Sequence, residues 1–181
     1  MKRTPAEDTH FRLLETWRGA MDLVGPGPLE PHFQDAAGAV AGLEAEGRWV
    51  DLGSGAGFPG IALAARHPSA EVWLVESRRK RAVFLERVLA EVDLPGARVV
   101  HGRSESLDDG LFDGVISRAY RQPAAYLADA GRVLRAGGRA VLLTGDKEAE
   151  VPEGFTWLAS TRYRVGRGWR RRHVLQKDVA T

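Results

Sequence analysis

The sequence of 181 residues contains no cysteine, which excludes disulfide bonds, thiolate metal sites and cysteine nucleophiles. No apolar run approaches the ~20 residues that a membrane-spanning helix needs. The first ten residues, MKRTPAEDTH, lack the apolar core of a signal peptide. We therefore expect a cytoplasmic protein that does not contact a membrane. The length and the apolar content of 44% fit one globular domain over 1–181.

Histidine is also scarce, and its spacing indicates no metal site. The five histidines are scattered along the chain, and each is expected to be exposed or satisfied within the core: His10, His32, His67, His101 and His173. The sequence shows no pair of residues spaced as a catalytic dyad. We therefore expect no metal ion and no general base or nucleophile among the site residues.

Lysine is rare: it accounts for four of the 26 basic residues. The net charge is +2, but residues 161–181 hold seven basic residues against one acid. This basic end is compatible with a polyanion partner such as nucleic acid. An edge strand kept soluble by arginines explains the same composition, and both interpretations remain open.

Strand-like and helix-like segments alternate through residue 145. The hydrophobic patterns predict strands at 49–52, 71–76, 97–102, 112–120 and 140–145, and helices at 7–21, 32–45, 77–96 and 123–134. Two extended runs joined by GRG then indicate a hairpin. We expect an α/β fold with a mostly parallel sheet, helices on both faces and a closing antiparallel hairpin. Its expected parts are an N-terminal helical region (1–46), a cofactor-binding core (47–145) and the hairpin region (146–181).

The stretch WVDLGSGAGFPGIALAARHP, residues 49–68, predicts a ligand site. A short apolar strand ends at Asp51, a loop with glycines at 53, 55, 57 and 60 follows, and IALAARH forms a helix with Pro59 in its first turn. Such a strand–loop–helix unit brings backbone N–H groups and the positive end of a helix close to a ligand. The unit is typical of nucleotide-type cofactor sites.

Two cofactor classes fit this loop. GAGFPG matches the dinucleotide pattern G-x-G-x-x-G, and Glu76 lies 21 residues after Gly55, so a nicotinamide or flavin cofactor remains possible. Asp51, however, extends the motif to D-x-G-x-G-x-G, the first motif of class I methyltransferases, in which an acid often lies near the ammonium group of S-adenosylmethionine. The terminal hairpin favours the methyltransferase as well.

Polar residues at the ends of the other strands are further candidates. Glu76 is placed to accept both ribose hydroxyls, or is an ordinary surface glutamate. Ser104 and Glu105 follow the third strand and could contact adenine, although Ser104 could equally cap a helix. Arg118 ends the fourth strand, where burial requires an anion. That anion is a cofactor carboxylate, an RNA phosphate, or a structural ion-pair partner such as Asp113 or another acid.

Four stretches together resemble one family, the 16S ribosomal RNA guanine-N7 methyltransferases RsmG (GidB). They are DLGSGAGFPGIALA, ESRRKRAVFL, FDGVISRAY and RRRHVLQK. The resemblance implies a class I S-adenosylmethionine-dependent methyltransferase (Rossmann-like) fold with a seven-stranded sheet. It also implies methylation of N7 of a guanine, with ribosomal RNA or the small ribosomal subunit as partner. The candidate cofactor-binding residues are Asp51, Gly53, Ser54, Gly55, Phe58, Glu76, Ser77, Ser104, Glu105 and Arg118.

The N-terminal region departs from the family pattern. Asp22–Val24 stands where the family has Asn-Leu-Thr, and His32–Ala36 keeps a His and an Asp but loses a Ser. An alternative is therefore a methyltransferase for a small molecule or protein, or a non-catalytic cofactor-binding domain. In either case we expect a monomer. Lys80 and Arg81 are candidates to meet RNA phosphate, and Trp17, Tyr120 and Trp169 are candidates to stack on a displaced base or to pack at the rim.

Overall fold

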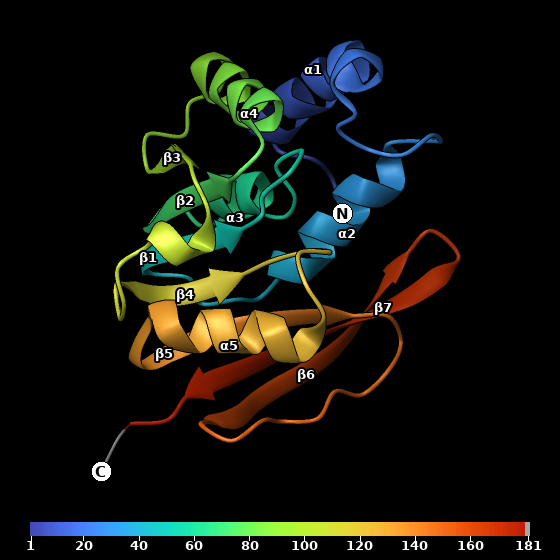
Figure 1. Ribbon diagram of the computed structural model, residues 1–181. Coiled ribbons are helices and arrows are strands. Elements are labelled where there is room, and N and C mark those ends of the chain that lie inside the picture. Colours follow the sequence, from blue (N-terminus) through green and yellow to red (C-terminus); the bar gives the residue numbers. More distant parts are fainter. Residues whose placement is uncertain (180–181) are drawn as a thin grey trace.

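The computed structural model describes residues 1–179 and contains one seven-stranded sheet over that range, of order β3-β2-β1-β4-β5-β7-β6 (Figure 1). Strands β1 to β5 are parallel, and β7 is antiparallel to both β5 and β6. This confirms the predicted fold class. The strands are β1 (Gly47–Leu52), β2 (Ala70–Glu76), β3 (Ala97–His101), β4 (Phe112–Ile116), β5 (Leu134–Thr144), β6 (Phe155–Val165) and β7 (Gly168–Lys177).

The helices begin and end within a few residues of the predicted positions. They are α1 (Pro5–Met21), α2 (Glu30–Val40), α3 (Gly60–Arg66), α4 (Arg79–Glu91) and α5 (Pro123–Val133), with a 3₁₀ turn, η1 (Ser104–Ser106). Helix α1 begins earlier than predicted because Thr4 and Glu7 form a capping box. Pro59 is the N-cap residue of α3 and not part of its first turn. No helix within residues 1–179 combines the length and the apolar content needed to cross a membrane.

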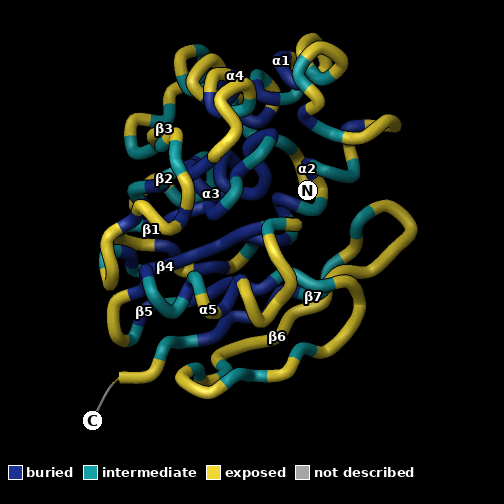
Figure 2. The backbone as a smooth tube through the Cα atoms, viewed as in Figure 1, coloured by how far each residue is buried: buried dark blue, intermediate teal, exposed yellow. Residues whose placement is uncertain are grey.

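The sheet divides the apolar core in two. Because side chains alternate along a strand, Trp49 faces one cluster, which α1 to α4 cover, while Val50 and Leu52 face the other, which α5 covers. Figure 2 shows the buried strands in the middle and the exposed hairpin at the edge. Helix α1 packs on α3 and α4, and α2 packs on α3 and β6. The predicted helices on both faces of the sheet are thus present. Within residues 1–179, α1 to α4 cover one face and α5 covers the other.

Strand β5 begins six residues before the predicted position. The segment LRAGGR, predicted as a turn, is extended and joins the sheet. Phe112 pairs with Leu134 and Gly114 pairs with Arg139, so β5 contains extra residues, as in a β-bulge, between the two pairs. Gly137 has a positive φ of 75° in this bulge. The glycines that suggested a chain reversal therefore accommodate an irregularity within the strand.

The terminal hairpin follows its prediction. Gly166 and Arg167 connect β6 to β7, and Gly166 has φ 57°, at a position where two-residue hairpin turns favour glycine. Residues 180 and 181, which the predicted single domain includes, lie outside the described residues.

Candidate functional site

The loop after β1 is held closed by its own polar groups. Ser54 donates its backbone N–H to the Val75 carbonyl at 3.0 Å and its hydroxyl to the Asp51 carbonyl at 2.9 Å. Ser54 is buried, so its side chain fixes the loop between β1 and β2. Gly53 has φ 69°, and a Cβ there would lie 2.6 Å from the Tyr120 ring. The loop therefore needs glycine at residue 53 for its backbone conformation and for the close approach of Tyr120.

Asp51 lies at the end of β1 and is completely buried. One carboxylate oxygen, Oδ2, accepts the Gly60 N–H at 2.9 Å at the beginning of α3. The other oxygen, Oδ1, has no hydrogen-bond partner in the described part of the chain. Burial raises the pKa of Asp51 to about 7. A cationic group reaching Oδ1 would favour the ionised carboxylate.

Glu76 ends β2 and is 5% exposed. Its Oε2 accepts the Gly55 N–H at 2.9 Å, and its Oε1 accepts the Arg78 N–H at 2.7 Å. The carboxylate therefore faces the glycine loop, as the motif spacing predicts, rather than solvent. Each oxygen has a further lone pair with which to accept a ligand hydroxyl.

A cavity of about 150 Å³ opens between the loop, β2 and the chain after β3. Four predicted residues line it, together with five that the sequence did not assign to the cofactor: Gly53, Ser77, Ser104 and Glu105, with Val75, Gly102, Arg103, Tyr120 and Arg121. Its volume is below the ~300–1,000 Å³ typical of ligand sites. It therefore fits one part of a nucleoside cofactor and not all of it.

Tyr120 forms one wall of this cavity. Its hydroxyl lies 2.6 Å from the Ser104 hydroxyl, and Arg121 contacts Glu105 at 2.8 Å. The backbone N–H of Glu105 and the Arg121 guanidinium lower the pKa of Glu105 to about 2. Ala119 has φ 56°, a left-handed conformation that turns the chain between Arg118 and Tyr120. The sequence carries no signal for this turn, because alanine rarely adopts it.

Arg118 lies two residues beyond β4, because the strand ends at Ile116 and not at the predicted residue 120. Its guanidinium lies 4.6 Å from the centre of the Phe58 ring and 3.3 Å from Asp35 of α2. Asp113 instead pairs with Arg135. The structural ion pair considered for Arg118 thus forms, with Asp35 as its partner. Asp35 also accepts the Tyr163 hydroxyl at 2.9 Å, which links α2 to the hairpin.

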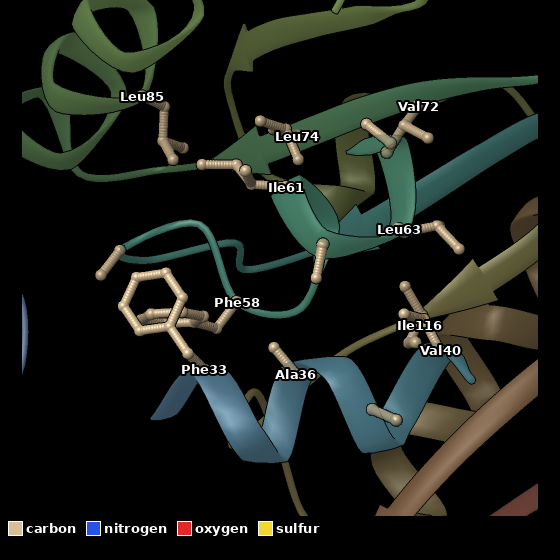
Figure 3. Close-up of a cluster of buried hydrophobic side chains, with 14 of the residues drawn as sticks. Phe33, Ala36, Val40, Phe58, Ile61, Leu63, Val72, Leu74, Leu85 and Ile116 are labelled. Carbon is tan, nitrogen blue, oxygen red and sulfur yellow. The ribbon is translucent and has the colours of Figure 1, made fainter. Parts of the chain in front are cut away.

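Phe58 is buried beneath the N-terminal helices rather than open to the cavity. Its ring meets the Phe33 ring edge-on, with 4.9 Å between the ring centres, and stacks on His32 with 5.8 Å between the ring centres. Figure 3 shows Phe58 and Phe33 next to each other in the buried cluster. His10 of α1 lies 4.9 Å from the same ring and donates from Nε2 to the Ala56 carbonyl at 2.7 Å. Burial lowers the pKa of His10 to about 4, so the ring is neutral near pH 7. His10 is therefore satisfied in the core, where it supports the loop.

The six arginines of the basic end divide into two groups. The first group is used internally. Arg172 is 6% exposed and donates to carbonyls at the end of α2, including Ala39 at 3.3 Å. Arg171 pairs with Glu148 at 2.5 Å, and Arg162 pairs with Asp146 at 2.6 Å. The second group is Arg164, Arg167 and Arg170, which are exposed and have no carboxylate partner within residues 1–179.

Lys80 and Arg81 also differ in accessibility. Lys80 is exposed in the first turn of α4. Arg81 donates to the Asp22 carbonyl at 2.9 Å and so links the end of α1 to α4. Lys80 is thus the freer of the two basic side chains predicted to meet phosphate.

Comparison with solved structures agrees with the fold. A putative O-methyltransferase from Klebsiella pneumoniae superposes with a TM-score of 0.68 over 99% of this chain and 92% of its own, at 16% identity. A putative methyltransferase from Escherichia coli gives a TM-score of 0.61 over 86% of this chain and 89% of its own, at 15% identity. At such identities the likeness concerns the fold alone.

Comparison of sequences identifies the family. The family model described as rRNA small subunit methyltransferase G (GidB) matches residues 8–160. A relative of that name from Alkalilimnicola ehrlichii is 34% identical, over 92% of this chain and 80% of its own. Another, from Syntrophobacter fumaroxidans, is 38% identical over 71% of this chain, and the match spans 64% of that relative, just under two thirds of its length. The chain therefore belongs to the family of rRNA small subunit methyltransferase G.

Proposed function

We propose that this chain transfers a methyl group from S-adenosylmethionine to N7 of a guanine in small-subunit ribosomal RNA, as a cytoplasmic monomer. The observation that carries this proposal is the family match over 8–160, which includes the glycine loop, Glu76 and Arg118. The alternatives, a small-molecule or protein acceptor and a non-catalytic domain, are not favoured by this family membership.

The residues of the site fit S-adenosylmethionine. The buried Oδ1 of Asp51 lacks a hydrogen-bond partner within residues 1–179, and an ammonium group would supply one. Glu76 has lone pairs for the ribose hydroxyls, beside a loop whose glycines permit close approach. Ser77, Ser104 and Glu105 line the cavity next to Glu76, where they could contact the base. Ser54, Gly55 and Phe58 support the site by fixing the loop, and Gly53 lies at its surface.

Dinucleotide cofactors fit less well. A dinucleotide has no ammonium group to meet the buried Asp51 Oδ1, which has no hydrogen-bond partner within residues 1–179. Family membership and the local chemistry therefore favour the same donor.

The bound donor supplies a methyl group on a positively charged sulfur. Guanine N7 has a free lone pair and no hydrogen, so the chain needs no general base. Its residues bind the donor, align it with the acceptor and exclude water. These are the contributions expected for a direct in-line displacement. Arg118, just after β4, is placed to contact an anionic group of the donor or of the RNA. Its guanidinium would then pair with that group as well as with Asp35. The target guanine must lie in a loop or leave its stack, because N7 is hidden in the narrow groove of A-form RNA.

The donor can be tested by calorimetry with S-adenosylmethionine and with NADH. We expect binding of the first and not of the second. Gly55→Asp should abolish binding, because it places a second carboxylate beside Glu76 where the cofactor must approach. Binding of NADH alone would refute the methyltransferase proposal.

The acceptor can be tested with radiolabelled donor and a mixture of ribosomal RNA and protein. Digestion with ribonuclease should release the label, whereas digestion with protease should leave it in the RNA. Label that is released by protease, or that appears in small molecules, would favour the alternative acceptors.

A further inference from the structure

The tip of the β6–β7 hairpin stands at the ligand edge of the sheet. Thr144 of β5 pairs with Arg171 of β7, and this is the last pair between these strands at the carboxyl end of β5. Residues 168–170 pair only with β6, so they extend beyond the end of β5 on the edge where the glycine loop lies. Figure 1 shows this part of the hairpin projecting from the body of the molecule.

The hairpin tip is fixed to the site through α2. The Gly166 N–H donates to the side-chain oxygen of Gln34 at 2.9 Å, and Tyr163 donates to Asp35 at 2.9 Å. Asp35 in turn pairs with Arg118 at the end of β4. The tip therefore has a defined position relative to the residues that would hold donor and acceptor.

Charge and aromatic surface are concentrated at this tip. Arg164, Arg167 and Arg170 are exposed, and none meets a carboxylate in the described chain. Trp169 is 40% exposed and lies opposite Arg164, whose guanidinium is 5.5 Å from the ring centre. Arg162 stacks on the same ring at 4.6 Å, but Asp146 neutralises its charge. Figure 2 shows the tip as exposed chain.

Free arginines beside an exposed tryptophan match single-stranded nucleic acid. Guanidinium groups neutralise phosphates, and an aromatic ring provides a platform on which a base stacks. Exposed arginines without an aromatic neighbour would be explained as charges that keep the edge strand β6 from pairing with another chain. Trp169, however, belongs to β7, and an exposed tryptophan contributes nothing to solubility.

We propose that the hairpin tip, formed by Arg164, Arg167, Trp169 and Arg170, is an RNA-docking surface beside the methyl-transfer site. It binds unpaired RNA next to the target guanine through phosphate contacts and base stacking. This inference rests on the proposed function for the identity of the polyanion as RNA. The internally used residues Arg171 and Arg172 are not part of this surface.

Filter binding of a full-length 16S rRNA transcript at several salt concentrations tests the surface. Arg164→Ala/Arg167→Ala should weaken binding about tenfold and reduce the salt slope by about 1.4, at ~0.7 for each phosphate contact. The matched control is Arg12→Ala/Arg87→Ala, which removes the same charge from exposed positions on α1 and α4. The control should retain the wild-type slope.

The stacking contact is tested separately. Trp169→Ala should weaken RNA binding about tenfold, whereas Trp169→Phe should retain most of it. The control Leu158→Ala removes an apolar side chain that is 47% exposed on β6 and should have no effect. Calorimetry with S-adenosylmethionine should give the same affinity for every variant, which shows that each has folded.

Four outcomes would overturn the inference. If the wild type binds and methylates RNA while Arg164→Ala/Arg167→Ala and Trp169→Ala behave as wild type, the docking surface is refuted and the proposed function stands. If tip and control double variants lose RNA binding equally, the effect is one of overall charge. If tip variants bind RNA normally but methylate intact subunits poorly, the tip contacts a ribosomal protein instead. If the wild type does not bind RNA at all, the proposed function fails together with the inference.

Discussion

Two buried carboxyl groups at neighbouring strand ends differ in how their oxygens are satisfied. Both oxygens of Glu76 accept backbone N–H groups, whereas Asp51 has one oxygen paired and one without a partner among the described residues. The motif spacing placed both acids at the carboxyl edge of the sheet, as the structure has them. It could not show which carboxylate oxygen of Asp51 has no partner among the described residues, because that depends on where the glycine loop places the Gly60 N–H.

Asp51 should affect the pH dependence of stability in a direction opposite to that of His10. Between pH 4 and 6.5 the unfolded state has Asp51 ionised while the folded state keeps it protonated, so its contribution to stability falls as pH rises. His10 is neutral when folded and protonated when unfolded over this range, so its contribution rises with pH. The two contributions oppose each other in the wild type.

Asp51→Asn removes the first contribution and leaves the second. Urea unfolding at pH 5 and pH 6 should therefore show the variant gaining up to about 1.4 kcal/mol more than the wild type on going to pH 6. Equal changes in the two proteins would mean that Asp51 is already ionised in the folded state.

Glu76→Ala should weaken S-adenosylmethionine binding by at least tenfold, because it removes the acceptor for two hydroxyl groups, and one bond to a charged group contributes about 1.5–3 kcal/mol. Calorimetry measures the effect, and circular dichroism verifies the fold. Glu86→Ala, at an exposed position on α4, is the control and should bind normally. Wild-type affinity in Glu76→Ala would remove Glu76 from the site.

At the scale of the elements, helix α2 connects the glycine loop, β4 and the hairpin. Its Phe33 packs on Phe58, its Asp35 pairs with Arg118, and its last carbonyls accept from Arg172. The helix itself was predictable from hydrophobic spacing, within five residues at its end. Its contacts were not, because they join residues between 25 and 133 positions apart, and no local pattern records such pairs.

Arg172→Ala should lower the free energy of unfolding by about 2–3 kcal/mol. The reason is that it leaves carbonyls at the end of α2 without their charged donor, in a partly buried position. Arg170→Ala, which removes an exposed neighbour, should change stability by less than about 0.5 kcal/mol. Urea denaturation of both variants makes the comparison. Equal effects would contradict the internal role of Arg172.

The distinction between internally bonded and exposed arginines applies to the whole basic end. A triple change of Arg170, Arg171 and Arg172 to alanine, which the sequence alone suggests as an RNA-binding test, would mix loss of stability with loss of RNA contact. Composition predicted a basic surface, but neighbouring acids and helix carbonyls decide which arginines remain free. Those neighbours come from α2 and from the segment after β5, so only the folded chain shows them.

At the scale of the whole molecule, the residues of the candidate site meet at one edge of the sheet. The glycine loop, the end of β2, the turn η1, the end of β4 and the hairpin tip all lie there. The mostly parallel α/β architecture and the closing hairpin followed from the sequence because alternating strand and helix units and hairpins have local signals. The order of the strands in the sheet was not predicted. The small cavity had no such local signal, because it forms where Tyr120 packs on the distant Gly53. The left-handed Ala119 had none either, because alanine rarely adopts this conformation.

The most direct test of the central claim is mass-spectrometric nucleoside analysis of 16S rRNA. The RNA is taken from cells that lack this protein and is incubated with S-adenosylmethionine and either the wild type or Glu76→Ala. We predict one additional 7-methylguanosine per RNA molecule with the wild type and none with the variant. If the wild type binds S-adenosylmethionine but adds no 7-methylguanosine to naked RNA or to small subunits, the account is contradicted.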